Sequence, residues 1–146
     1  MTNGELAREL YLQLLKTHMT FRQTIQKLLR FHNLDMTFEM LQVMSRLWVQ
    51  QGVSQQCLAE RTAKDKACLT HLVNNLERRG WVTRRKDMTD QRNRLIFLTP
   101  EGEALSNQVK PLIKSVYDHA GAKMGQENIQ SCLENLRLLD EGFYEI

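Results

Sequence analysis

The fold of this chain is decided by residues 65–99, which read DKACLTHLVNNLERRG from 65 to 80 and WVTRRKDMTDQRNRLIFLT from 81 to 99. Asp65 is a good helix cap, and the apolar residues that follow recur at the three- and four-residue spacing of one helix face. Gly80 supplies the left-handed residue that commonly ends a helix. Apolar and β-branched residues at 81–86 and 94–99 then predict two strands, joined by a charged loop at 87–93. We therefore expect a short helix followed by a β-hairpin.

The predicted helix separates an apolar face from a polar one. Leu69, Leu72, Val73 and Leu76 share one side and are expected to face the core. Lys66, Thr70, Asn74 and Arg78 follow a four-residue step on another side, with Ala67, His71 and Asn75 alongside. The polar side chains are short near the N-terminal half, where a helix inserted end-first into a DNA groove meets base edges.

Positive charge is concentrated in the same segment. From Arg61 to Arg94 the chain has ten lysines and arginines against four acids, a net charge of +6, whereas the rest carries −3. Contacts to phosphates dominate the affinity of proteins for nucleic acids. A basic cluster that coincides with a helix-and-hairpin pattern therefore indicates a polyanion-binding surface rather than an ordinary solvated face.

The other segments predict further helices on both sides of this stretch. Amphipathic spacing predicts helices at 5–31, from Thr37 to about Gln51, and from Gln55 to about Arg61 with Ser54 as its cap. The last of these and the helix at 65–79 form a helix-turn-helix. Helices at 103–122, with Pro111 expected to kink the chain, and at 127–140 complete the pattern. The predicted class is mainly α with a small β-hairpin.

Bulk properties exclude several other classes. The 146 residues suffice for one domain, and no apolar run approaches the roughly 18 residues of a membrane span. The N-terminus lacks the pattern of a secretory signal, so we expect a cytoplasmic protein without a membrane partner. The three cysteines are widely spaced, which predicts no metal site. Because no catalytic triad, paired carboxylate motif or phosphate-binding glycine loop is visible, we expect no enzyme and no cofactor.

Three groups of residues point to a known family. The loop carries Asp90 and Arg92, with Leu98-Thr99 after five further residues and then the helix start Pro100-Glu101-Gly102. The preceding helix and strand carry Leu69-Thr70, Val73, Leu76-Glu77-Arg78-Arg79-Gly80-Trp81-Val82 and Arg84. Leu34-Asp35-Met36-Thr37 and Val43 occupy the entry to the second helix. Together these motifs resemble the MarR family of bacterial winged-helix regulators over residues 34–102. The chain departs from the family at Met40, where glutamine is frequent, and at Ala67 and Cys68, where serine or threonine is usual.

The resemblance implies a single MarR-type domain over residues 1–146. Residues 34–102 would form the winged helix-turn-helix DNA-binding lobe, and residues 5–33 and 103–146 would form N- and C-terminal dimerisation helices. It implies a homodimer that binds double-stranded DNA and regulates transcription, which we expect to be a repressor released by a small-molecule effector. The recognition helix at 65–79 would enter the major groove and the wing at 87–93 the adjacent minor groove.

Residue roles follow from the resemblance and from side-chain chemistry. By resemblance, Arg92 reaches the minor groove and Asp90 orients it, which agrees with the negative potential of a narrow groove. On the helix, asparagine can pair with adenine edges and lysine with guanine or phosphate, whereas the basic strand residues are expected to contact phosphates. The predicted DNA-binding residues are Ser54, Gln55, Lys64, Lys66, Thr70, His71, Asn74, Arg84, Arg85, Lys86, Asp90, Arg92 and Arg94.

The resemblance also implies an effector. Family members often respond to small aromatic compounds bound where the dimerisation helices meet the DNA-binding lobe. The residues expected there are His18, Phe21, Arg22, Met44 and Trp48, each of which is also compatible with ordinary core packing. Cys68, near the start of the recognition helix, is either a redox-sensitive thiol or a small residue tolerated there.

One alternative from another functional class stays open at this point. Winged helices also serve as protein-interaction modules that do not bind DNA. The basic cluster and the Asp90-x-Arg92 motif argue against that alternative, and the salt dependence of binding distinguishes the two, since only phosphate contacts are steeply weakened by salt.

Overall fold

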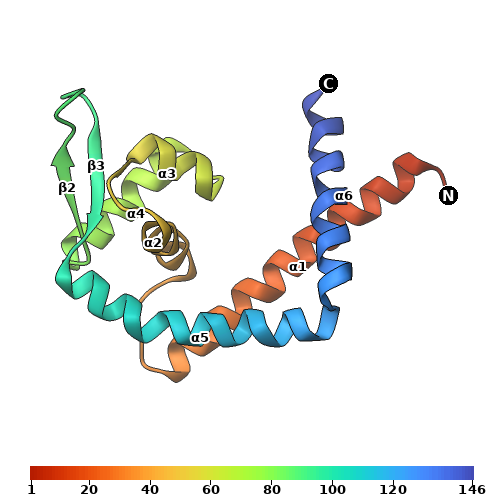
Figure 1. The fold of residues 1–146 in the computed structure, drawn as a ribbon, viewed down its shortest axis with the longest axis horizontal. Helices are drawn as coiled ribbons and strands as arrows, with labels where there is room; N and C mark the ends of the chain where they lie inside the picture. Colours follow the sequence, from red (N-terminus) through yellow and green to blue (C-terminus); the bar gives the residue numbers. More distant parts are fainter. The chain divides into compact units, whose positions relative to one another are not determined.

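The computed structural model describes residues 1–146, which divide into two compact units: residues 25–110, and residues 1–24 together with 111–146. The elements are, in order, α1 (Asn3–Phe31), α2 (Phe38–Val49), β1 (Val53–Ser54), α3 (Gln55–Thr62), α4 (Lys66–Arg78), β2 (Val82–Lys86), β3 (Arg94–Leu98), α5 (Pro100–Met124) and α6 (Gln126–Tyr144). Figure 1 follows this order from red to blue. The predicted mainly helical class with a β-hairpin is confirmed.

The unit of residues 25–110 packs three mutually contacting helices, α2, α3 and α4, against a small antiparallel sheet. The strand order is β1-β3-β2, with Val82 opposite Leu98 in β2–β3 and Val53 opposite Ile96 in β1–β3. The apolar face predicted for α4 is buried, and it joins a core that includes Leu29, Met44, Leu47, Leu58, Leu69, Val73, Leu76 and Ile96. In Figure 1 the β2–β3 hairpin lies at the edge of this unit.

Helix starts in this unit follow the predicted caps. The side chains of Thr37, Ser54 and Asp65 each accept a hydrogen bond from the backbone amide three residues on, at the beginnings of α2, α3 and α4. These bonds satisfy amides that have no partner inside a helix. Gly80 has a φ of +78°, and the Trp81 amide donates to the carbonyl of Leu76, which is the glycine-dependent helix end expected for α4.

The junction between the sheet and α5 depends on a close backbone contact. The amide of Thr99 donates to the carbonyl of Trp81 (3.1 Å), and the Thr99 hydroxyl caps α5 by accepting from the Gly102 amide (3.0 Å). A Cβ atom on Gly102 would collide with the Trp81 carbonyl oxygen, so this position requires glycine. The first turns of α5 also bind α2, since the Trp48 indole donates to the buried Ser106 hydroxyl (2.6 Å).

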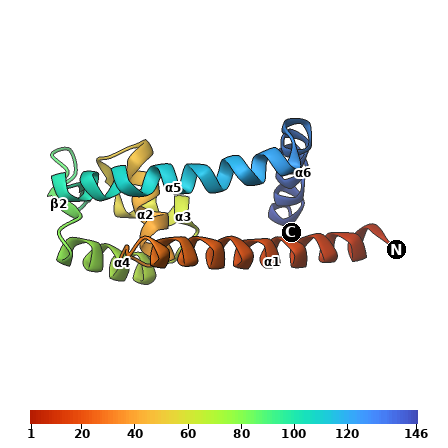
Figure 2. The same cartoon turned by 90° about the horizontal axis from the view of Figure 1, so that it is seen from below.

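The second unit consists of helical segments only, from α1, α5 and α6. The ring of Phe21 in α1 stacks on Tyr117 in α5, with centroids 5.4 Å apart. α5 continues through Pro111 to Met124, so it ends two residues beyond the predicted helix at 103–122. Only Gly125 separates it from α6, and Figure 2 shows α6 turning away there. α6 contains no buried residue, and its side chains Leu133, Leu138, Phe143 and Tyr144 are exposed. None of the helices of the chain combines the length and the apolar character that a membrane crossing requires.

Candidate nucleic-acid interface

The polar face of α4 lies on the outside of the unit of residues 25–110. Lys66, His71 and Asn74 are exposed, whereas Thr70 is half-buried. His71 shares a polar contact with the Asn75 amide (3.3 Å), and Asn75 in turn accepts from Arg78. The helix therefore presents several hydrogen-bonding groups whose orientations are set by neighbours on the same helix.

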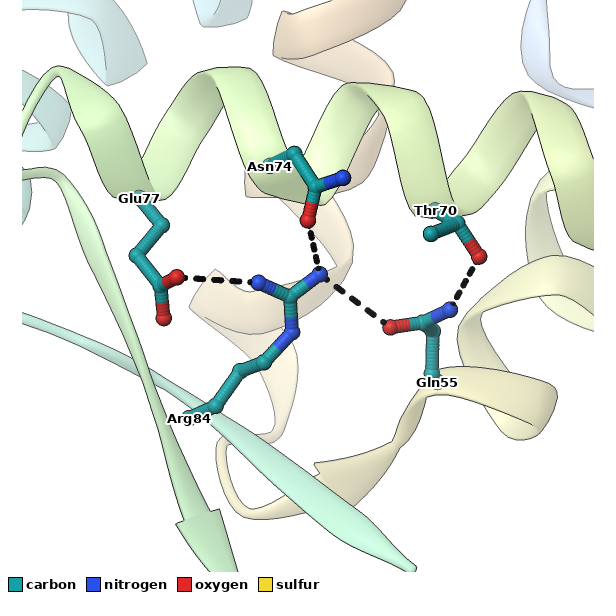
Figure 3. A network of polar contacts seen from close by, with 5 residues as sticks. All are labelled: Gln55, Thr70, Asn74, Glu77 and Arg84. Carbon is teal, nitrogen blue, oxygen red and sulfur yellow. Dashed lines mark hydrogen bonds and ion pairs between the residues drawn. The ribbon is translucent and has the colours of Figure 1, made fainter.

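Arg84 on β2 holds side chains from two helices, as Figure 3 shows. Its Nη1 donates to Oε1 of Glu77 (3.0 Å), and its Nη2 donates to Oδ1 of Asn74 (2.7 Å) and to Oε1 of Gln55 (3.4 Å). The Nε2 of Gln55 donates to the Thr70 hydroxyl (2.5 Å). Only 18% of the Arg84 side chain is exposed. The strand, α3 and α4 are thus joined by one polar network.

The loop between β2 and β3 is held by hydrogen bonds that its aspartate side chains accept from other residues of the loop. Asp87 accepts from the hydroxyl (2.7 Å) and the amide (2.9 Å) of Thr89, and these bonds, the hydroxyl first, lower the pKa of the Asp87 carboxyl below its ordinary value. Asp90 accepts from the backbone amide of Arg92 (3.1 Å). The Asp90 carboxylate therefore shapes the turn that carries Arg92, whose side chain is exposed.

The remaining basic residues of the hairpin are exposed. The Arg85 guanidinium lies over the Phe97 ring, 4.5 Å from its centroid, and Arg94 donates to the carbonyl of Gln91 (3.1 Å). Lys86 completes β2 and is exposed. These cations are available to a polyanion, in contrast to the largely enclosed Arg84.

A concave surface connects the helix-turn-helix with the wing. It has a volume of about 630 Å³, and Lys66, Arg92 and Arg94 line it together with the α3 start at Ser54 and Gln55. Residues that are far apart in sequence, on α3, α4 and the hairpin, thus meet at one basic hollow. Lys64, also predicted to bind DNA, is half-buried in the connection before α4.

The residues predicted for an effector fall in both units. Met44 is fully buried and Trp48 is bound to Ser106, both in the unit of residues 25–110. His18, Phe21 and Arg22 belong to the other unit, where Phe21 lines a pocket of about 490 Å³. The other lining residues of that pocket are Thr17, Thr20, Thr24, Ser115, Val116, His119 and Ala120.

Two features of this interface were not predicted from the sequence. The strand β1 has only two residues, too few for a periodic pattern to reveal. The sequence motif contains Glu77 but does not predict its ion pair with Arg84, because that pairing depends on how β2 returns along α4.

The cysteines are free thiols, and those of Cys68 and Cys132 are exposed. No group of histidine, cysteine or acidic residues could hold a metal ion.

Comparison with known proteins places this geometry in a family. Residues 36–93 match the model of the MarR family. The transcriptional regulator TtmR of Methylorubrum extorquens is 31% identical over 116 residues, which cover 80% of this chain. The chain spans 57% of the length of TtmR. The transcriptional regulator HosA of Escherichia coli is 29% identical over 103 residues, covering 70% of this chain and 76% of HosA.

Solved structures share the fold. A MarR family transcriptional regulator from Silicibacter pomeroyi has a TM-score of 0.80 at 21% identity and covers 99% of this chain and 96% of its own. MepR of S. aureus in a DNA complex has a TM-score of 0.79 at 22% identity (91% and 96% covered). NadR in complex with 4-hydroxyphenylacetate has a TM-score of 0.76 at 24% identity (88% and 89% covered). The family match, the winged helix-turn-helix geometry and these relatives, which are regulators rather than enzymes, identify residues 36–93 of this chain as a MarR-type domain.

Proposed function

We propose that the protein is a dimeric, sequence-specific DNA-binding regulator that places α4 in the major groove and the loop 87–93 in the minor groove. The observation that carries this proposal is the concave basic surface on which Lys66 of α4 meets Arg92 and Arg94 of the hairpin. A helix with short polar side chains reads base edges, and flanking cations hold the phosphates. MepR, which shares the fold, was solved in a complex with DNA.

Phosphate contacts give this proposal a direct test. Purified protein is titrated by fluorescence anisotropy against the DNA upstream of its own gene and against random DNA, each at two salt concentrations. Since bound phosphates release counterions, we expect tight binding to the upstream DNA that weakens steeply with salt. Binding that ignores salt would instead favour the protein-interaction module.

The dimer is proposed because two-fold symmetric operators require two reading heads about one helical turn apart. Exposed apolar side chains in the unit of residues 1–24 and 111–146 support it. They include Leu6, Leu10, Leu15, Met19, Leu133, Leu138 and Phe143. A large exposed apolar surface typically marks a protein interface, and a second copy of this chain is the occupant that the proposed function needs.

We further propose that the regulator is a cytoplasmic repressor released by a small aromatic effector. The pocket of about 490 Å³ that Phe21 lines is large enough for one aromatic ring with a polar substituent, and its threonines and His119 offer hydrogen-bonding groups. NadR was solved with 4-hydroxyphenylacetate, so this compound is a suitable first probe.

The effector proposal is tested on the protein–DNA complex. We expect 4-hydroxyphenylacetate to release DNA from the wild type and to act more weakly on Phe21→Ala. Phe31→Ala removes an exposed ring outside this pocket and serves as the matched control. Equal release from the wild type and Phe21→Ala would exclude this pocket as the effector site.

A further inference from the structure

We propose that Arg84 is a positioning residue that fixes the direction of the hydrogen bonds on α4 and so decides which base edges the helix accepts. Its sequence context alone predicts a phosphate contact, as for its neighbours Arg85 and Lys86. The network around the Arg84 guanidinium supports a different role (Figure 3). This inference rests on the proposed DNA-binding function.

The first step is the chemistry of the guanidinium group. Arginine carries only donors, so every amide group in contact with it must turn its oxygen toward it. Asn74 and Gln55 both do so, at 2.7 Å and 3.4 Å from Nη2. The orientation of each side-chain amide, which is otherwise free to reverse, is therefore fixed before DNA is bound.

The second step concerns Asn74. Because its oxygen faces Arg84, its Nδ2 group points elsewhere, and Figure 3 shows this nitrogen on the side away from the guanidinium. Asn74 is exposed, so the amide hydrogens are available to a ligand. In the major groove these donors suit an acceptor such as N7 of a purine, O6 of guanine or O4 of thymine. The exocyclic amino group of cytosine, itself a donor, is disfavoured at this position.

The third step carries the same constraint to Thr70. The Nε2 of Gln55 must donate to the Thr70 hydroxyl oxygen (2.5 Å), since its own oxygen is held by Arg84. The hydroxyl proton of Thr70 in turn goes to the carbonyl of Lys66 (2.8 Å). Thr70 consequently has no proton left for a base and can offer only a lone pair or its methyl group. One guanidinium thus sets the hydrogen-bonding character of two predicted contact residues.

Burial and charge argue that Arg84 is not itself a phosphate contact. Its side chain is 18% exposed, and its charge is paired with Glu77 at 3.0 Å. Arg85 and Lys86, the next two residues of β2, are exposed and can neutralise phosphates. Holding three acceptors at once also requires the planar fork of arginine, which the single ammonium of lysine cannot replace.

The experiment begins with selection of a preferred duplex from a random pool by the wild-type protein. The affinities for this duplex and for a scrambled duplex are then measured over a salt series for Arg84→Lys and Arg84→Met, with Arg85→Met as the matched control. We expect both Arg84 variants to reduce the preference for the selected duplex by about tenfold, the scale of one good base contact, with an unchanged salt slope. Arg85→Met should weaken binding to both duplexes alike and lower the slope by about 0.9, the value for one lost phosphate.

A double-mutant cycle tests whether Arg84 acts through Asn74. If it does, Arg84→Met should cost less preference in the Asn74→Ala background than in the wild type, since the two changes share the loss of the Asn74 contact and only the effect on Thr70 remains. Additive losses would overturn the proposal, as would full preference in Arg84→Lys or a reduced salt slope in Arg84→Met. None of these outcomes would disturb the proposed DNA binding.

A measurement on the free wild-type protein keeps the proposal falsifiable if the Arg84 variants unfold. Slow rotation of a guanidinium held by three acceptors should give separate NMR resonances for its two Nη groups, which Asn74→Ala should bring closer to averaging. Averaged resonances in the wild type would overturn the positioning role. If the wild type prefers no duplex, the proposed function is wrong. If the wild type prefers the selected duplex and Arg84→Lys keeps the full preference, only the positioning role of Arg84 is wrong.

Discussion

At the scale of single residues, the arginines of the basic segment differ by environment rather than by type. Arg84 is largely enclosed and bound to three side chains, whereas Arg92 is exposed at the tip of the hairpin. Exposed cations contribute to affinity for a polyanion but little to stability. The same substitution at these two positions should therefore have different consequences.

Arg92→Ala should lower the affinity for operator DNA by more than about tenfold, or about 1.4 kcal/mol, because a guanidinium is lost from the minor groove. Dimerisation and the melting temperature should stay unchanged, since the side chain is exposed. Anisotropy titration and thermal melting check both parts. Arg46→Ala, an exposed arginine outside the basic segment, is the control, and unchanged affinity in Arg92→Ala would remove the wing from the mechanism.

Asp87 should titrate below its ordinary pKa of 3.8, and Thr89→Ala should bring its pKa back toward that value, because the hydroxyl bond that favours the carboxylate is lost. A lowered pKa means that the bonds stabilise the folded loop above the ordinary pKa and that this gain is lost as the pH falls through the lowered one. Carboxyl chemical shifts followed by NMR over pH would measure both values. An identical pKa in the two proteins would contradict the assignment to Thr89.

At the scale of elements, the winged unit depends on how its segments are joined. The predicted caps Thr37, Ser54 and Asp65 are confirmed because capping is a local interaction that the neighbouring sequence specifies. The contact of α5 with the residue that precedes β2 is not local. Gly102 packs its backbone against the carbonyl of Trp81, which pairs with Thr99 at the end of the hairpin.

Gly102→Ala should reduce the free energy of unfolding by about 2 kcal/mol or more, because the new methyl group collides with a backbone oxygen that no side-chain rotation can move. Urea denaturation measures the change. Gly142→Ala is the matched control: nothing lies within 4 Å of its Cβ position, so alanine there should stabilise α6 slightly. A similar stability for Gly102→Ala and the wild type would show that α5 can shift away.

At the scale of the whole molecule, the apolar surface of the unit of residues 1–24 and 111–146 is unusual for a monomer. α6 has no buried residue although its leucines recur at helical spacing, and Leu133 is 52% exposed. Burial of such a stripe requires a partner, and the proposed palindromic operator requires two copies of the reading head.

Leu133→Asp should shift the protein toward monomers and weaken operator binding at low protein concentration, because a carboxylate in an apolar interface is costly to desolvate. Sedimentation velocity over a range of concentrations, alongside anisotropy, measures both effects. Ser131→Asp places the same charge at an exposed position outside the leucine stripe and should change neither. A wild type that sediments as a monomer at every concentration would exclude the dimer.

Local sequence signals suffice to predict the helix order, the start and end of α4, the position of the hairpin and the basic character of the surface. These features follow from local signals: caps, glycine at Gly80, periodicity and charge. The tertiary structure alone decided that β1 pairs with β3, that Gly102 touches Trp81, and that Glu77, Asn74 and Gln55 share Arg84. Each of these contacts joins residues from different elements, so it depends on how the core packs. No periodic pattern in the sequence predicts it.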